Sequence, residues 1–182
     1  MMNHLTTFRM RSTAVLVAGV VLRRRLTLVG FAVVIALVTP LRGATAHADN
    51  KRLNASVLAN VYTVQRQAGC DTDIKADPQL RLAAQWHTND LLHNRSLVGD
   101  VGSDGSTPQD RANAAGFRGT VAQTVAINPA LAISGIELIN RWYHNPDYYA
   151  IMSDCDNAAI GVWSENSLDR TVVVAVYGTP QL

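Results

Sequence analysis

The sequence predicts an α+β fold in which helices surround a small, mostly antiparallel sheet. Two observations predict it. Apolar residues recur at helical spacing through much of residues 50–152, whereas the last part of the chain has two apolar, β-branched segments, 158–164 and 171–177, on either side of a polar loop. Helices followed by a terminal hairpin are typical of an α+β layer architecture. Residues 49–182 have the length of one domain.

Residues 1–48 are predicted to be a secretory signal peptide. Three arginines at 23–25 precede an apolar segment, 26–38, and Ala46-His47-Ala48 fits the small-residue pattern of a cleavage site. A second apolar segment, 13–22, lies upstream, so retention of the leader as a membrane anchor is the alternative. Neither segment alone reaches the roughly 18–20 residues that a membrane-spanning helix needs. Residues 49–182 are therefore expected to be secreted, either free outside the cell or held in the cell envelope.

Removal of the leader changes the net charge of the protein. The whole chain has 16 Lys and Arg against 14 Asp and Glu, a formal charge of +2. The leader contains six of the arginines and no acidic residue, so residues 49–182 carry ten basic and fourteen acidic side chains, a net charge of −4. A mildly acidic domain lacks the basic footprint of a nucleic-acid-binding protein. Nucleic acid is therefore not an expected partner, and membrane contact is expected only through an uncleaved leader.

The first helix of the mature chain is predicted to begin at Asn50, whose side chain can cap it, and to end at Gly69. Its apolar face is formed by Leu53, Val57, Val61 and Val64.

Two further helices follow in the first half of the domain. Asp77-Pro78 is a helix start, with a cap and then proline at the first position, and this helix is expected to run to about Arg95. Thr107 is expected to cap the third helix, over 108–115. The apolar face of the second helix is formed by Leu80, Ala83, Ala84, His87 and Leu91.

In the second half, residues 120–127 are apolar and β-branched and predict a short strand. Asn128-Pro129 is expected to begin a fourth helix, and Asn145-Pro146 to end it and to begin a short helix that reaches Met152. The face of the fourth helix is expected to contain Ala132, Ile136, Ile139 and Trp142 or Tyr143.

Cys70 and Cys155 are the two cysteines of the chain. In an exported protein an even pair of cysteines favours a disulfide, and two buried free thiols are the alternative. A bridge would close a loop of roughly 85 residues, which stabilises the fold by about 4 kcal/mol in the chain-entropy model.

Five ordered segments resemble the CAP superfamily (cysteine-rich secretory proteins, antigen 5, pathogenesis-related 1), in particular its bacterial SCP-like secreted domains. Residues 102–117, which begin Gly-Ser-Asp-Gly-Ser-Thr-Pro, resemble the family stretch GSDGSTPxDRxxAAGY. The other four segments are 82–90, 141–146, 159–162 and 174–178. The resemblance covers roughly 53–178 and implies an αβα sandwich with a metal cleft beside the Gly-Ser-Asp-Gly loop.

The cleft positions depart from the family pattern. The resemblance implies a histidine, a glutamate and a second histidine at three cleft positions, where this chain has Asp100, Gln123 and Tyr148. At a fourth position, where the resemblance implies another glutamate, this chain has Ala159. Zinc prefers imidazole, thiolate and carboxylate ligands, so we expect a degenerate site that holds no metal and no other cofactor. Asp100 with Asp104 could form a calcium-type oxygen site. The same composition is typical of a tight turn, and the loop residues Gly102, Ser103, Asp104, Gly105 and Ser106 are interpreted as structural.

Histidines could replace the missing cleft ligands. His144 lies four residues before Tyr148, so the two share a side if the segment is helical, and His144 is a further candidate of the cleft. A solvated residue at a helix end is the alternative. His87 lies on the apolar face of the second helix and is expected to be a core histidine with one hydrogen bond, and His93 is expected at the surface.

Four aromatic residues, Trp142, Tyr143, Tyr148 and Tyr149, lie close together in the sequence. They could line an apolar or lipid-holding groove, or they could cap the core at a helix end. No Gly-x-Ser-x-Gly nucleophile motif and no Cys-x-x-Cys motif is present.

These features predict a secreted, non-catalytic binding module. Its partner is expected to be a small apolar ligand or lipid, or a cell-envelope or host protein, at the cleft of Asp100, Gln123 and Tyr148. The alternative is a hydrolase of cell-envelope material or peptide, with Asp100 as acid or base and His144 assisting. A third interpretation is a purely structural exported domain.

Overall fold

The computed structural model describes residues 45–129 and 132–181, with side chains from Asn50 onward. The predicted leader therefore lies almost wholly outside the described residues. The elements are α1 (Thr45–Gln67), β1 (Lys75–Ala76), α2 (Pro78–His93), α3 (Pro108–Ala114), β2 (Gly119–Asn128), α4 (Gly135–Tyr143), α5 (Pro146–Ser153), β3 (Ala159–Ser167) and β4 (Arg170–Pro180).

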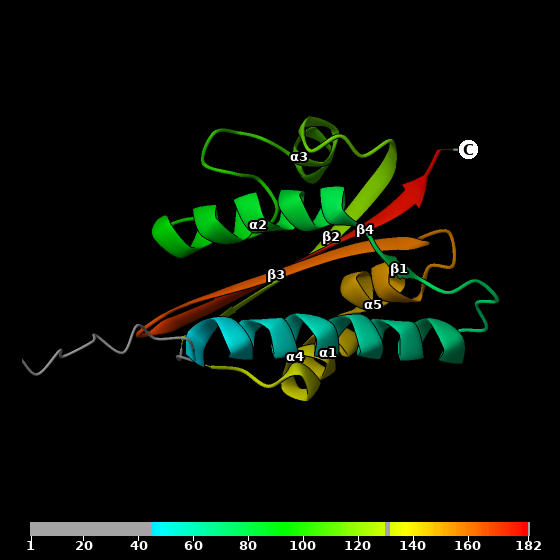
Figure 1. Ribbon diagram of the computed structural model, residues 1–182, viewed down its shortest axis with the longest axis horizontal. Helices are drawn as coiled ribbons and strands as arrows, with labels where there is room; N and C mark the ends of the chain where they lie inside the picture. The colour runs from blue at the N-terminus through cyan, green and yellow to red at the C-terminus, as the bar shows by residue number, and fades with distance from the viewer. Residues whose placement is uncertain (1–44, 130–131, 182) are drawn as a thin grey trace, which may run out of the picture. The chain divides into compact units, whose positions relative to one another are not determined.

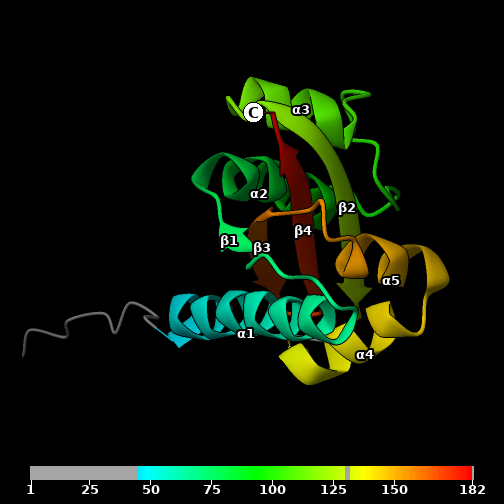
Figure 2. The ribbon, with the colours of Figure 1, turned by 90° about the vertical axis from the view of Figure 1, so that its right-hand side faces the viewer.

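The strands form one sheet in the order β1-β3-β4-β2. β3 and β2 both pair with β4 in the antiparallel sense, and the two residues of β1 pair with β3 in parallel. Helices α2 and α3 cover one face of the sheet, and α1, α4 and α5 cover the other (Figures 1 and 2). The fold is therefore an α+β, αβα sandwich around a mostly antiparallel sheet, as the sequence predicted.

Two apolar cores lie on the two faces of β4, because successive side chains of a strand point to opposite faces. Val173, Ala175 and Tyr177 pack into the core shared with α1, α4 and α5. Val172, Val174 and Val176 pack into the core shared with α2 and α3. All of these side chains are fully buried, so β4 is the central strand of the domain.

Several predicted starts and ends are confirmed. Asp77 caps α2 by accepting from the amide of Leu80 at 2.8 Å. Thr107 and Asp110 form a reciprocal capping box at α3, and Asn145 caps α5. The hairpin is also confirmed, although its strands extend into the predicted loop and the turn narrows to residues 168–169. The two-residue strand β1 was not predicted, because so short a segment carries no periodic pattern.

The predicted cap of the first helix is wrong. α1 begins at Thr45, so Asn50 lies inside the helix. Its Oδ1 accepts a hydrogen bond from Nδ2 of Asn166 in β3 at 3.0 Å, so the side chain serves a tertiary contact instead of a cap. The predicted cleavage point after Ala48 falls within the first turns of α1.

The predicted start of the fourth helix is also wrong. Asn128 is the last residue of β2, paired with Thr171, and α4 begins at Gly135 with Ser134 as its cap. The residue before a proline is disfavoured in the helical region, which keeps Asn128 extended. The buried face of α4 consists of Leu138, Ile139 and Trp142, whereas Ile136 is 77 % exposed and Ala132 and Tyr143 are also exposed.

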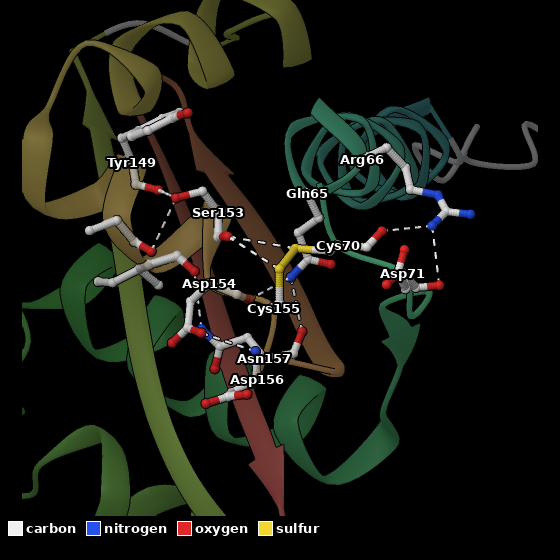
Figure 3. Close-up of a disulfide and its surroundings, with 12 residues drawn as sticks. Gln65, Arg66, Cys70, Asp71, Tyr149, Ser153, Asp154, Cys155, Asp156 and Asn157 are labelled. Carbon is white, nitrogen blue, oxygen red and sulfur yellow. Dashed lines mark hydrogen bonds between the residues drawn. A yellow bond between two sulfur atoms is a disulfide. The ribbon is translucent and has the colours of Figure 1, made fainter. Parts of the chain in front are cut away.

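Cys70 and Cys155 form the predicted disulfide (Figure 3). It joins the segment after α1 to the turn between α5 and β3. Gln65 reinforces this junction, because its Nε2 donates to the carbonyls of Asp154 and Asn157, each at 3.0 Å.

Candidate functional site: a closed polar cleft

The Gly-Ser-Asp-Gly loop is a tight turn held by its own backbone. The amide of Gly102 donates to the carbonyl of Ser106, and the amide of Gly105 donates to the carbonyl of Gly102, both at 2.9 Å. Asp104 accepts from the amide of Ser106 at 2.9 Å, and hydrogen bonds from Ser106 lower the pKa of this carboxyl. Gly105 has a positive φ of 81°, which glycine adopts without strain. The Asp104 carboxylate is thus committed to the turn.

Asp90 on α2 anchors the same loop from outside. It accepts from the backbone amide and from the hydroxyl of Ser103, both at 2.7 Å, and from Asn94 at 2.6 Å. Partial burial disfavours its charged form, but these hydrogen bonds outweigh burial and lower the pKa of Asp90.

Arg111 of α3 occupies the centre of the cleft and is only 6 % exposed. One end of its guanidinium, Nη1, donates to the carbonyl of Ser106 at 2.7 Å and to its hydroxyl at 3.1 Å. The other end, Nη2, donates to the carbonyl of Asp100 at 2.8 Å and to Oε1 of Gln123 at 3.1 Å. Burial lowers the pKa of Arg111, and the surrounding aspartates, beginning with Asp104 and Asp100, oppose that shift.

Gln123 completes the network from β2. It is 3 % exposed, and its Nε2 donates to Oδ1 of Asp100 at 2.9 Å while its Oε1 accepts from Arg111. The structure therefore brings Asp100 and Gln123 together. We call the set of Arg111, Gln123 and Asp100 the cleft network.

Burial raises the pKa of Tyr148 of α5, and the negative charges of Asp100 and Asp147 add to this rise. The backbone of Val125 opposes this rise in the pKa, and the ring of Tyr148 meets the edge of Trp142 at a centroid distance of 6.3 Å. Trp142 donates from Nε1 to the carbonyl of Val125 at 3.1 Å. Both aromatic residues therefore close the end of the core beside β2.

The other predicted positions lie apart from the cleft network. His144 is the exposed C-cap of α4, where its Nδ1 contacts the carbonyl of Asn140 at 2.8 Å and its ring contacts Tyr143. In the described part of the chain, no contact links His144 with Asp100, Gln123 or Tyr148. Ala159 is buried in the core between β3 and α2.

His87 is a fully buried histidine with one hydrogen bond, as expected. Its Nε2 lies 2.8 Å from the carbonyl of Gly99 and must donate to it, which leaves Nδ1 as a lone-pair acceptor without a partner among the described residues. Burial lowers the pKa of His87. His87 and Arg111 both line a cavity of about 390 Å³ next to the Gly-Ser-Asp-Gly loop.

Sequence reasoning missed Arg111 as a cleft residue. One indication was present in the sequence: Arg111 follows the Thr107 cap by one helical turn and precedes Ala112, which is buried in the structure. This signal is weak, because an arginine near the end of a short helix is ordinarily solvated.

The cleft residues do not fit the metal that the fold family implies. Gln123 offers a neutral amide whose two polar atoms are engaged, and the Tyr148 phenol has a raised pKa and so stays protonated at neutral pH. Among the described residues, no group of three His, Cys, Asp or Glu side chains is arranged to hold a metal ion. The arrangement is a hydrogen-bonded cluster in which Arg111 and Gln123 are buried and Asp100 lies at the surface.

No family model and no curated protein sequence matches this chain. Solved structures do match it. An outer surface protein of Borrelia burgdorferi superposes with a TM-score of 0.62 over 72 % of this chain and 95 % of its own, at 16 % identity.

Two further matches are longer proteins. An extracellular SCP-domain protein of Bacillus anthracis superposes with a TM-score of 0.62 over 77 % of this chain and 44 % of its own, at 15 % identity. A cysteine-rich secretory protein of Staphylococcus aureus gives a TM-score of 0.51 over 71 % of this chain and 39 % of its own, at 14 % identity. This chain thus matches less than half the length of these two proteins.

The architecture and these superpositions show that the chain has the CAP superfamily fold, as the sequence resemblance implied. These similar structures are those of extracellular or surface proteins. Within residues 45–129 and 132–181, no helix is both long and apolar enough to cross a membrane.

Proposed function

We propose that this chain is an exported CAP-fold protein that acts by binding and has no catalytic activity. One observation carries the proposal. Gln123, at the position where the resemblance implies a metal-binding glutamate, is buried with both amide atoms engaged, one by Asp100 and one by Arg111.

The cleft network resists rearrangement into a reaction centre. A catalytic carboxylate must be free to reach a substrate proton or a metal. Withdrawing Gln123 would remove a partner from the buried Arg111 guanidinium and the donor to the Asp100 carboxylate, and an unpartnered buried polar group costs about 1–3 kcal/mol, more when it is charged. The cleft network therefore serves the stability of the domain. A partner would contact the surface next to the network.

The surface next to Asp100 suits such a contact. Val98 is 77 % exposed and Val101 is 53 % exposed, so two apolar side chains flank Asp100 on the segment between α2 and α3. Apolar side chains at the surface beside a polar cluster offer area that a partner could bury. We propose that this face takes a small apolar molecule or a cell-envelope or host-side protein.

The proposal is tested by native mass spectrometry of the purified protein, before and after mild chelation, with assays on peptidoglycan and peptide substrates. In mass spectrometry we expect no metal to stay bound. In the hydrolysis assays we expect the native chain and an Asp100→Asn/His144→Ala double variant to give the same result. A stoichiometric metal adduct that survives chelation and is lost in Asp100→Asn would overturn the proposal in favour of a hydrolase.

A further inference from the structure

A cavity of about 390 Å³ is lined by α2, α3 and the Gly-Ser-Asp-Gly loop, on the face of the sheet that these two helices cover (Figure 1). We call it the α2–α3 cavity. Its volume falls in the range of about 300–1,000 Å³ that is typical of small-molecule sites. Arg111 lines the cavity together with residues that the cleft network does not contain, so the cavity is a separate site that shares one side chain with that network.

Arg111 brings a buried donor without a partner to this cavity. Its two Nη atoms donate to Ser106, Asp100 and Gln123. Its Nε has no hydrogen-bond partner among the described residues, although the side chain is only 6 % exposed. Buried polar groups are nearly always hydrogen-bonded, so an occupant with an acceptor atom would complete the guanidinium.

His87 brings a buried acceptor to the same cavity. Its Nε2 donates to the carbonyl of Gly99, which leaves the lone pair of Nδ1 without a partner in the described part of the chain. The lining therefore calls for one acceptor and one donor from its occupant. A hydroxyl group supplies both, whereas an ammonium group supplies no acceptor and a hydrocarbon supplies neither.

The charge of the lining disfavours an anion. Three aspartates, Asp90, Asp104 and Asp110, line the cavity against a single arginine. The pKa of each carboxyl is lowered, against burial in Asp90 and by hydrogen bonds from Ser106 and Thr107 in the other two, so all three are ionised at neutral pH. The lining histidine adds no positive charge there, because burial lowers its pKa. An anion could accept from the guanidinium, but it would lie beside like charges.

The rim of the cavity offers further acceptors and an apolar surface. Asp110 accepts at Oδ2 from the amide and the hydroxyl of Thr107, at 2.9 Å and 2.6 Å, and its Oδ1 has no hydrogen bond with any described residue. Trp86 lines the same cavity and is 40 % exposed, so one part of its indole ring is open to a ligand. A sugar ring combines hydroxyl groups at its edge with apolar C–H faces, and it therefore suits both features.

We propose that the α2–α3 cavity binds an uncharged saccharide unit, with one apolar face of the sugar ring on the indole of Trp86. Hydroxyl groups of the sugar would accept from Nε of Arg111 and donate to Nδ1 of His87 and to Oδ1 of Asp110. This inference concerns a second site and a different ligand chemistry, and it does not depend on the binding proposed beside Asp100.

The test is an NMR titration of the isotope-labelled protein with three neutral trisaccharides, chitotriose, cellotriose and maltotriose. We expect at least one of them to shift the Nε1–H signal of Trp86 and the Nε–H signal of Arg111 along a single saturation curve. Trp86→Ala should weaken the binding of that sugar at least tenfold. Asp110→Asn should weaken it at least threefold, because an amide oxygen is a weaker acceptor than a carboxylate. Added salt should leave the affinity unchanged, because the ligand is neutral.

A pelleting assay with purified peptidoglycan distinguishes two sources of the saccharide. Cosedimentation of the native protein, but not of Trp86→Ala, would assign the site to a glycan of the cell envelope. Binding of a soluble trisaccharide without cosedimentation would assign it to a free oligosaccharide.

Matched variants control for general effects. Tyr62→Ala removes an aromatic side chain of similar exposure, 38 %, from α1 on the other face of the sheet. Asp147→Asn neutralises an exposed aspartate in the first turn of α5, as Asp110→Asn does in the first turn of α3. Both control variants should bind within twofold of the native protein, and circular dichroism should show that all four variants are folded.

Three outcomes would overturn the inference. The first is no shift with any trisaccharide at millimolar concentration together with no cosedimentation with peptidoglycan. The second is equal weakening by Trp86→Ala and Tyr62→Ala. The third is equally tight binding of dextran sulfate or of choline, which would show that charge selects the occupant. Each would leave the metal and hydrolysis results at the cleft unaffected, so failure here is distinct from failure of the proposed function.

Discussion

Gln123 joins a buried cation to a carboxylate through one neutral side chain. A glutamate in its place could accept from Arg111 but could not donate to Asp100, and it would put a second negative charge beside that carboxylate. A histidine in place of Asp100 would likewise lose the oxygen that Nε2 of Gln123 contacts. Gln123 and Asp100 therefore suit each other, since the amide donates to the carboxylate while it accepts from Arg111.

The first prediction concerns this residue. Gln123→Ala should lower the free energy of unfolding by about 2–3 kcal/mol, because it removes one partner each from Arg111 and Asp100 in a buried site. Urea unfolding at neutral pH measures the loss. Gln67→Ala, at an exposed position at the end of α1, should change it by less than about 0.5 kcal/mol. Equal effects of the two variants would show that the network does not stabilise the fold.

The second prediction concerns His87, whose pKa in the folded state lies below its ordinary value of 6.5 because of burial. The unfolded state therefore binds more protons between the folded pKa and 6.5, so stability rises with pH in that window. The contribution of His87 is fully present above pH 6.5 and is lost as the pH falls through the folded pKa.

Urea unfolding between about pH 5 and pH 8 checks this pH dependence, which should flatten below about pH 6.5 in His87→Gln. His93→Gln, at an exposed histidine on the same helix, should keep the native slope. An NMR titration that gave His87 a pKa at or above 6.5 would contradict the prediction.

At the scale of elements, the contact between α2 and β3 depends on a glycine, because this residue has no side chain to hold the helix away from the strand. The β3 residues facing α2 must be small where the helix begins, and Gly161 meets this requirement. β4 shows the complementary rule: its alternate residues are large enough to fill a core on each face.

The third prediction follows from this approach. Gly161→Ala should lower the free energy of unfolding by about 3 kcal/mol, because the new Cβ overlaps backbone that cannot move alone. Gly69→Ala is the comparison, since Gly69 has a φ of +90° but open space around it. Its cost should be only about 1 kcal/mol, from backbone strain. Chemical denaturation measures both, and a smaller loss for Gly161→Ala would show that α2 shifts freely on the sheet.

At the scale of the whole molecule, the disulfide connects parts of the chain that are far apart in sequence. Cys70 and Cys155 are 85 residues apart, and the loop that they close contains every element from β1 to α5. Such a link restricts the unfolded chain more than it alters the folded one.

The fourth prediction is that reduction destabilises the domain strongly. A Cys70→Ser/Cys155→Ser variant should lose about 4 kcal/mol of unfolding free energy in the chain-entropy model. Urea unfolding with and without a reducing agent measures it, and the midpoint of the double variant should not respond to the reducing agent. An unchanged midpoint of the native protein after confirmed reduction would contradict the prediction.

The sequence by itself determined the features that depend on neighbouring residues or on composition. The caps at Asp77, Thr107 and Asn145 and the hairpin were predictable because a cap bonds within one turn and a strand alternates with period two. The disulfide was predictable because the chain has only one pair of cysteines. The resemblance of five ordered segments supplied the layer architecture.

Only the tertiary structure decided how the cleft is filled. Arg111 meets Gln123 twelve residues later, and Gln123 meets Asp100 twenty-three residues earlier, across elements whose packing no local pattern encodes. Asn50 was misread for the same reason, since its partner Asn166 is 116 residues away. The local sequence predicts contacts within one helical turn, such as a cap that accepts from a backbone amide. The partners of buried polar side chains depend on which elements the two apolar cores bring together.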